Sequence, residues 1–180
     1  PVVMHDEEID RTTDGTGYIK DYTISEIRKF HLANGEPVPM LSELFEVLQN
    51  RDVYINLEFK TNKVHDVGIE GIVLALVKKY HFVHPIIFSS FNYQTLKNCQ
   101  QIDLHQQYCF LMKVPVALPE HFVKKNHFAA IHPHFYLPSK VTQRIWTVDN
   151  PKTAKRYFKL GVAGIFTNNF ELMNKVKREG

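Results

Sequence analysis

The amino-acid sequence predicts an α/β fold with a parallel sheet, because strand-like and helix-like segments alternate along most of the chain. The chain has 180 residues, of which 44% are hydrophobic and 23% charged, which is typical of one globular domain with a packed core. No glycine-rich phosphate loop follows the first strand, so the sequence favours neither a dinucleotide-binding fold nor a P-loop.

The N-terminal part of the chain has a less regular pattern. Residues 2–4 are apolar and predict a short strand that ends at the His-Asp pair of residues 5–6. A turn-rich stretch follows over residues 10–17, in which two glycines are expected to adopt positive φ angles. A Thr-x-x-Glu capping box predicts the start of a short helix over residues 23–30.

After residue 40 the spacing of apolar residues predicts a regular alternation of strands and helices. The predicted strands are 53–59, 85–90, 107–112, 128–132, 144–148 and 161–167. The predicted helices are 41–48, 69–80, 93–99, 119–125, 151–160 and 170–177. A crossover between parallel strands usually needs at least about 10–12 residues. Only residues 136–143 separate Phe135 from Arg144, so a helix is absent there or residues are missing.

Composition excludes several classes of partner. The formal net charge is +3 without a basic run, which argues against a nucleic-acid partner. The longest apolar runs have only a few residues, so no segment is expected to cross a membrane. Cys99 and Cys109 are too few for a disulfide scaffold and form no CxxC pair, so we expect buried thiols rather than a disulfide.

Polar residues at the ends of the predicted strands are the candidates for chemistry, because reactive groups of parallel α/β barrels gather there. Glu58 and Lys60 are two residues apart on one strand, so both side chains should face the same side. A carboxylate beside an ammonium in a cleft suits a hard cation together with a phosphate. A surface ion pair is an equally good interpretation of this strand alone.

Three further strand ends have two interpretations each. The pair His5-Asp6 fits an acid/base histidine oriented by a carboxylate, or a loop with a capping aspartate. His132 and His134 have the spacing of two metal ligands, but no third ligand follows at a useful distance. Trp146 fits a core position, or a platform for the carbon skeleton of a substrate.

Seven segments, in order along nearly the whole chain, resemble the glycerophosphodiester phosphodiesterase family. They are residues 2–6, 9–17, 38–44, 55–60, 86–91, 145–149 and 161–167. The His-Asp pair followed by Arg-Thr-Thr is specific to this family, and so is the Glu-x-Lys strand. The resemblance implies a TIM (β/α)8 barrel, with about six of the eight strands in this chain and no visible sixth crossover helix. It also implies one domain over residues 1–180, with residues 1–40 as a family-specific insertion and residues 41–180 as barrel strands three to eight.

The resemblance further implies metal-dependent hydrolysis of glycerophosphodiesters to glycerol 3-phosphate and an alcohol, with Mg²⁺ or Ca²⁺ as the cation. It implies that His5 is one of two acid/base histidines and that Glu58 is a metal ligand. It implies that Lys60 contacts the phosphate, and that Phe91 and Trp146 surround the glycerol. The expected partner is a small-molecule glycerophosphodiester. The compartment, cytoplasmic or extracytoplasmic, and the oligomeric state stay open, and membrane association would need a segment outside this chain.

The chain also departs from the family pattern. The family's His-Arg and Glu-x-Asp strands precede the His-Asp element and do not occur here. We therefore expect an upstream segment to supply the second histidine, an arginine and most metal ligands. The last strand ends in Thr167-Asn168, where the family has Thr-Asp.

Two alternatives to this enzyme remain at the level of sequence. One is a non-catalytic remnant of the barrel that serves in binding or structure. The other is a phosphodiester lyase similar to sphingomyelinase D, which shares the barrel and its histidines. The Arg-Thr-Thr stretch and the Glu-x-Lys strand favour the glycerophosphodiesterase.

Overall fold

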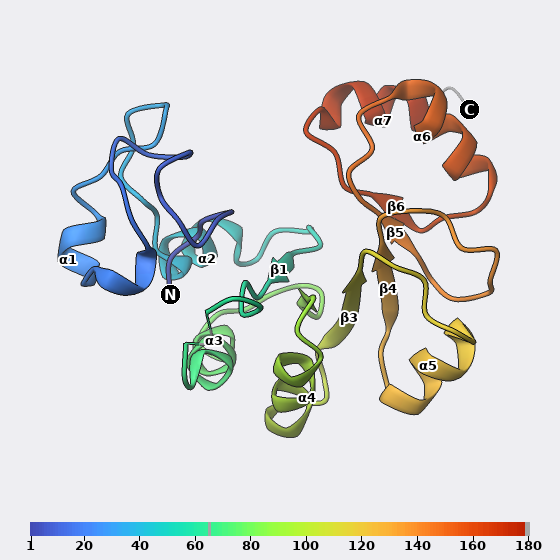
Figure 1. The fold of residues 1–180 in the computed structure, drawn as a ribbon, viewed down its shortest axis with the longest axis horizontal. Coiled ribbons are helices and arrows are strands. Elements are labelled where there is room, and N and C mark those ends of the chain that lie inside the picture. Colours follow the sequence, from blue (N-terminus) through green and yellow to red (C-terminus); the bar gives the residue numbers. More distant parts are fainter. Residues whose placement is uncertain (65, 179–180) are drawn as a thin grey trace.

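A computed structural model describes residues 1–64 and 66–178, in which helices pack around short parallel strands (Figure 1). The strands are β1 (Asn56–Glu58), β2 (Ile87–Ser90), β3 (Gln107–Met112), β4 (Ala130–Pro133), β5 (Arg144–Ile145) and β6 (Gly164–Ile165). The α-helices are α1 (Ile24–Ile27), α2 (Leu41–Leu48), α3 (Ile69–Val77), α4 (Tyr93–Ile102), α5 (Pro119–Asn126), α6 (Pro151–Lys159) and α7 (Phe170–Arg178). A 3₁₀ turn, η1 (Ile19–Asp21), precedes α1.

All paired strands are parallel and follow the order of the chain. One sheet has the order β1-β2-β3-β4, and β5 pairs with β6. A parallel bridge from Ile131 to Gln143 and a hydrogen bond from Trp146 N to Pro133 O (3.2 Å) join β4 to β5. A sheet of parallel strands in sequential order, with helices between them, is the arrangement of a TIM barrel. The predicted fold class is confirmed, with six of the barrel's strands in the described residues.

The predicted strand at residues 2–4 is wrong. Val2 forms only an isolated antiparallel bridge with Met40, and no regular strand of the described residues begins before β1. The later strands are where the pattern predicted them. The strand at residues 107–112 has the predicted bounds, whereas the regular parts of the others are shorter, because strand ends leave the hydrogen-bond ladder before the apolar pattern ends. The capping box at Thr23 and Glu26 is present at the start of α1.

The two glycines of the turn-rich stretch have different roles. Gly17 has φ +101°, as expected for a left-handed turn position. Gly15 has no positive φ, and a Cβ there would lie 2.5 Å from Cδ1 of Phe30. Gly15 is therefore required for close packing and not for its backbone angles.

No helix connects β4 to β5, which agrees with the short spacing in the sequence. The buried side chain of Gln143 accepts a hydrogen bond from Leu137 N (3.0 Å) and donates one to Leu137 O (2.7 Å). These bonds satisfy the backbone N–H and C=O groups of Leu137, which lies inside the connection. Residues 136–143 therefore connect β4 to β5 as a loop that these hydrogen bonds stabilise.

The two faces of the sheet have different characters. Leu57, Phe88 and Tyr108 share one row of the register and pack in the main hydrophobic core with residues of α3 and α4. Phe88 stacks on Tyr108 with ring centroids 5.8 Å apart. The next row, Glu58, Ser89 and Cys109, faces the opposite side, because side chains alternate along a strand. The polar residues of the strand ends therefore lie on the inner side of the curved sheet.

The cysteines are free and buried, as the sequence predicted. Burial raises the pKa of Cys99 to about 12 and that of Cys109 to about 11. Both side chains therefore stay as neutral thiols at physiological pH. In the residues that the structure describes, no helix is both long and apolar enough to span a bilayer.

Residues 1–40 form a lobe beside the strands (Figure 1). Its own small core contains Ile9, Ile27 and Val38. Backbone hydrogen bonds from Val3 N to Pro39 O and from Leu41 N to Pro1 O, each 2.9 Å, connect the start of the chain to the start of α2. The lobe is thereby held where its first residues reach the strand ends. Its status as a family-specific insertion in one domain stays a prediction.

Replacing Phe88 by alanine tests the core beneath the sheet. Phe88 is 0% exposed, so we expect Phe88→Ala to lower the free energy of unfolding by about 3–5 kcal/mol. Phe170 is 67% exposed, and Phe170→Ala should change the free energy of unfolding by less than about 0.5 kcal/mol. Urea denaturation followed by circular dichroism measures both. An equal loss of unfolding free energy in the two variants would contradict the burial of Phe88 in the core.

Candidate active site

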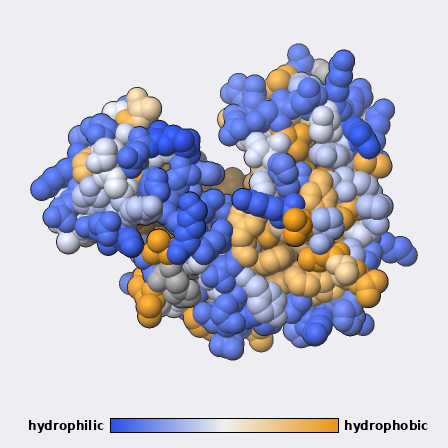
Figure 2. Space-filling view, in the orientation of Figure 1, coloured by the Kyte–Doolittle hydropathy of each residue, from blue (hydrophilic) through white to orange (hydrophobic). Residues whose placement is uncertain are grey.

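A cavity of about 800 Å³ opens between the N-terminal lobe and the ends of the strands. Figure 2 shows the molecule hollowed between these two parts. The cavity is lined by side chains from the lobe and from the residues that follow the strands: His5, Asp6, Arg11, Glu58, Lys60, Ser89, Phe91, Leu111, Lys113, Trp146, Phe166, Thr167 and Asn168, among others. All five site residues predicted from the sequence are in this set.

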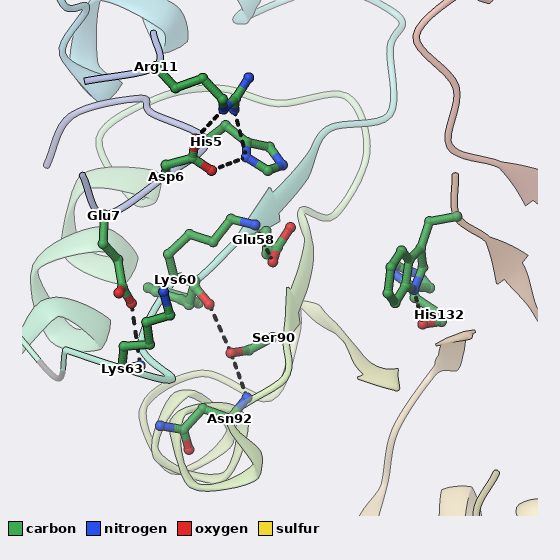
Figure 3. Close-up of polar contacts among 12 residues, drawn as sticks. His5, Asp6, Glu7, Arg11, Glu58, Lys60, Lys63, Ser90, Asn92 and His132 are labelled. Atoms are coloured by element: carbon green, nitrogen blue, oxygen red, sulfur yellow. Dashed lines mark hydrogen bonds and ion pairs between the residues drawn. The ribbon is translucent and has the colours of Figure 1, made fainter. Parts of the chain in front are cut away.

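Glu58 and Lys60 form an ion pair inside the cavity. The Lys60 Nζ lies 2.7 Å from Glu58 Oε1, and the two side chains are only 29% and 26% exposed. Phe59, between them in the sequence, packs on the opposite side in the hydrophobic core. Figure 3 shows Lys60 extending toward Glu58, below the cluster of His5, Asp6 and Arg11. The pair is therefore a partly buried part of the cavity wall and not a solvated surface pair.

Buried hydrogen bonds fix the end of β1 against β2 and α4. Ser90 Oγ donates to Phe59 O (2.9 Å) and accepts from Asn92 N (3.0 Å) (Figure 3). Asn92 Nδ2 donates to Thr61 O (2.9 Å), and the hydroxyls of Thr61 and Thr95 are 2.7 Å apart. The backbone on both sides of Lys60 is thereby held, which restricts where its side chain can reach.

His5 is oriented by a carboxylate, as one interpretation of the sequence expected. Its Nδ1 donates to Asp6 Oδ1 (2.6 Å), and Arg11 Nε donates to Asp6 Oδ2 (2.6 Å) (Figure 3). The Arg11 guanidinium and then His5 hold the pKa of the Asp6 carboxyl below its ordinary value. Asp6 is therefore an anion at neutral pH. This bond leaves the other ring nitrogen of His5, Nε2, for a ligand.

The rings of Phe91 and Trp146 contact each other at the ends of the strands. Their ring centroids are 5.4 Å apart and their planes are 89° apart. Trp146 Nε1 donates to His132 O (2.6 Å), which fixes the indole, and the His134 ring lies 4.6 Å from it. The geometry agrees with a platform at the cavity wall more than with a core tryptophan, because both rings line the cavity.

His132 and His134 do not form a metal site. His132 is fully buried, and desolvation followed by the nearby Arg144 charge lowers its pKa to about 3. Among residues 1–64 and 66–178, no three His, Cys, Asp or Glu side chains gather as ligands for a metal ion. Glu58 is paired with Lys60, and a hard cation takes several oxygen ligands. The described residues therefore do not form a divalent-cation site by themselves.

The corner of the cavity where the sequence departs from the family pattern is well ordered by hydrogen bonds. Asp149 Oδ1 accepts from Thr167 Oγ1 (2.8 Å) and from Asn168 N (2.7 Å), and Asp149 Oδ2 accepts from Asn168 Nδ2 (2.8 Å). These bonds lower the pKa of the Asp149 carboxyl below its ordinary value. The loops after β5 and β6 are thus tied together with asparagine at position 168.

Sequence reasoning assigned no role to several lining residues. Arg11 belongs to the Arg-Thr-Thr motif that was noted, but only the structure shows that it binds Asp6. Leu111 lies one residue before the end of β3 and Lys113 directly follows the strand, and neither was predicted from the sequence as a site residue. Their position at a strand end is the signal that would have found them.

Known proteins are similar to this chain along most of its length. The model of the glycerophosphoryl diester phosphodiesterase family matches residues 1–172. A glycerophosphodiester phosphodiesterase of Caldanaerobacter subterraneus is 32% identical over 99% of this chain and 81% of its own length. A glycerophosphodiester phosphodiesterase of Bacillus altitudinis is 27% identical over 98% of this chain and 80% of its own length.

Solved structures have the same fold. A phosphodiesterase of Oleispira antarctica, in complex with the product sn-glycerol-3-phosphate, has a TM-score of 0.87 at 20% identity. It is matched over 98% of this chain and 78% of its own. A glycerophosphodiester phosphodiesterase of Parabacteroides distasonis has a TM-score of 0.79 at 22% identity, over 99% of this chain and 78% of its own. The chain belongs to the glycerophosphoryl diester phosphodiesterase family.

Proposed function

We propose that this protein hydrolyses glycerophosphodiesters to glycerol 3-phosphate and an alcohol. The observation that supports this most is one cavity lined by both a carboxylate-oriented histidine, His5 of the N-terminal lobe, and a partly buried lysine, Lys60, after β1. A phosphodiester needs a group that moves protons and a cation that offsets phosphate charge. The names of the sequence relatives and the product bound in the Oleispira antarctica structure point to the same substrate class.

His5 supplies proton transfer in this proposal. An imidazole can accept and donate a proton, and the anionic Asp6 fixes the orientation of the ring. Arg11 holds Asp6 from the other side and keeps it ionised. In this proposal the neighbouring glycerol hydroxyl attacks phosphorus, which forms a cyclic phosphate and releases the alcohol, and water then opens the cyclic phosphate to glycerol 3-phosphate. His5 would then serve either this hydroxyl or the leaving alcohol.

Lys60 binds the phosphate in this proposal, and Phe91 and Trp146 contact the carbon skeleton of the glycerol. An ammonium inside a partly buried cavity stabilises the extra negative charge of the transition state more than it would in bulk water. The ion pair with Glu58 positions the Lys60 ammonium in the cavity. The aromatic pair offers an apolar surface beside the polar wall.

A divalent cation, Mg²⁺ or Ca²⁺, with Glu58 as one ligand, remains a proposal from the family resemblance. When bound, such a cation neutralises phosphate charge. The paired state of Glu58 means that Lys60 would have to release it for that role.

The proposed activity is tested by incubating the purified full-length protein with glycerophosphocholine and glycerophosphoglycerol, with Mg²⁺ or Ca²⁺ added, because the 180 residues alone are expected to lack part of the site. Glycerol 3-phosphate is measured with glycerol-3-phosphate dehydrogenase, and we expect its release from at least one of the two. Binding of these compounds by the folded protein without any release would indicate a non-catalytic remnant. Turnover of sphingomyelin in place of both would indicate the lyase.

Replacement of His5 tests its catalytic role. His5→Ala should lower kcat about 10²–10⁴-fold, because proton transfer is lost. Asp6→Asn should lower kcat less, since the histidine remains but loses the charge that orients it. His121→Ala, an exposed histidine on α5, is the control. Unchanged kcat in His5→Ala would refute the assignment.

Replacement of Lys60 tests the phosphate contact. Lys60→Gln should lower kcat/KM about 10²–10³-fold, because the transition state loses a cationic donor. Lys79→Gln, at an exposed lysine after α3, should leave kcat/KM unchanged. Steady-state kinetics with unaltered circular dichroism separate this effect from unfolding. A Lys60→Gln variant within twofold of the wild type would contradict the proposed role.

A further inference from the structure

Lys113 is, with Lys63, a cation of the cavity wall that forms no ion pair among the described residues. It follows β3, is exposed and lines the same cavity as Lys60. Arg11 and Lys60 each have a carboxylate partner, whereas no carboxylate of residues 1–64 or 66–178 lies within ion-pair distance of Lys113. The charge of Lys113 is therefore available to a ligand in the cavity.

The ammonium of Lys113 also lies against an aromatic ring. Its Nζ lies over the Phe91 ring, 5.6 Å from the centroid, which is the geometry of a cation–π contact. Phe91 and Trp146 meet edge to face, and the His134 ring lies against Trp146. A quaternary ammonium is recognised by open aromatic faces. Here the Phe91 face is already covered by a cation of the chain itself, so the aromatic pair is not a cage for a cationic head group.

The part of a glycerophosphodiester that this charge can distinguish is the alcohol head group. The phosphate has the same charge in every such substrate, and the glycerol has none. Choline and ethanolamine head groups are cationic, whereas glycerol and inositol head groups are neutral.

We propose that Lys113 is a specificity-determining residue, which disfavours cationic head groups and favours neutral or anionic ones. This inference rests on the proposed function, because it concerns the substrate of the same cavity. The interaction between Lys113 and a cationic head group would be a repulsion across a solvent-filled space. Such a repulsion corresponds to about a three- to tenfold discrimination at low ionic strength, and it weakens as salt is added.

The experiment compares glycerophosphoglycerol with glycerophosphocholine, which have neutral and cationic head groups. Dissociation constants are measured by calorimetry, and kcat/KM by glycerol 3-phosphate release, in 20 mM and 500 mM NaCl. The proteins are the wild type, Lys113→Gln, Lys113→Glu and the control Lys125→Gln, which removes an exposed lysine at the other end of α5.

We expect the wild type to prefer glycerophosphoglycerol at 20 mM NaCl and to lose most of this preference at 500 mM. Lys113→Gln should reduce the preference about three- to tenfold, Lys113→Glu should reverse it, and Lys125→Gln should leave it unchanged. If Lys113 had only a structural role, its replacement would change the dissociation constants and kcat/KM of both substrates equally. That change would not depend on salt.

Two outcomes would overturn the inference. One is a ratio of dissociation constants that is the same in the wild type and in Lys113→Glu. The other is the absence of binding of either compound to the wild type. Failure of the proposed function is a separate result, since both compounds would then bind without release of glycerol 3-phosphate. In that case the ratio of dissociation constants still decides whether Lys113 distinguishes head-group charge.

Discussion

The parallel register of β1 to β4 is the constraint on which the candidate site depends. It places Leu57 beside Phe88 and Glu58 beside Ser89, so that one row of side chains packs under the helices and the next lies inside the curved sheet. A shift of one residue in β1 would exchange these two rows. The hydrophobic core therefore fixes the position of Glu58 in the cavity, although that residue contributes little to the core.

A second requirement is that the N-terminal lobe presents its own residues to the strand ends. His5 belongs to no regular strand, and its position depends on the bridge between Val2 and Met40 and on the bonds of Asp6. The two walls of the cavity thus have different origins. The wall with Lys60 is set by the sheet, and the wall with His5 is set by the bridge of Val2 to Met40 and the bonds of Asp6.

Much of this arrangement could be predicted from the sequence. Strand and helix periods locate β1 to β6 and the helices between them, because burial on one or both faces imposes those periods. The predicted strand at residues 2–4 was wrong, since a short apolar run does not show whether it has a pairing partner. The contact of Arg11 with Asp6 and that of Lys113 with Phe91 depend on tertiary placement, which periodicity does not describe.

We propose that one cavity binds the phosphate at the Lys60 wall with His5 within reach. A crystal structure of the protein with sn-glycerol 3-phosphate tests it most directly. We predict phosphate oxygens within hydrogen-bond distance of Lys60 Nζ and the His5 ring, with the glycerol carbons against Phe91 and Trp146. A ligand bound elsewhere, with Lys60 still paired only to Glu58, would contradict the claim.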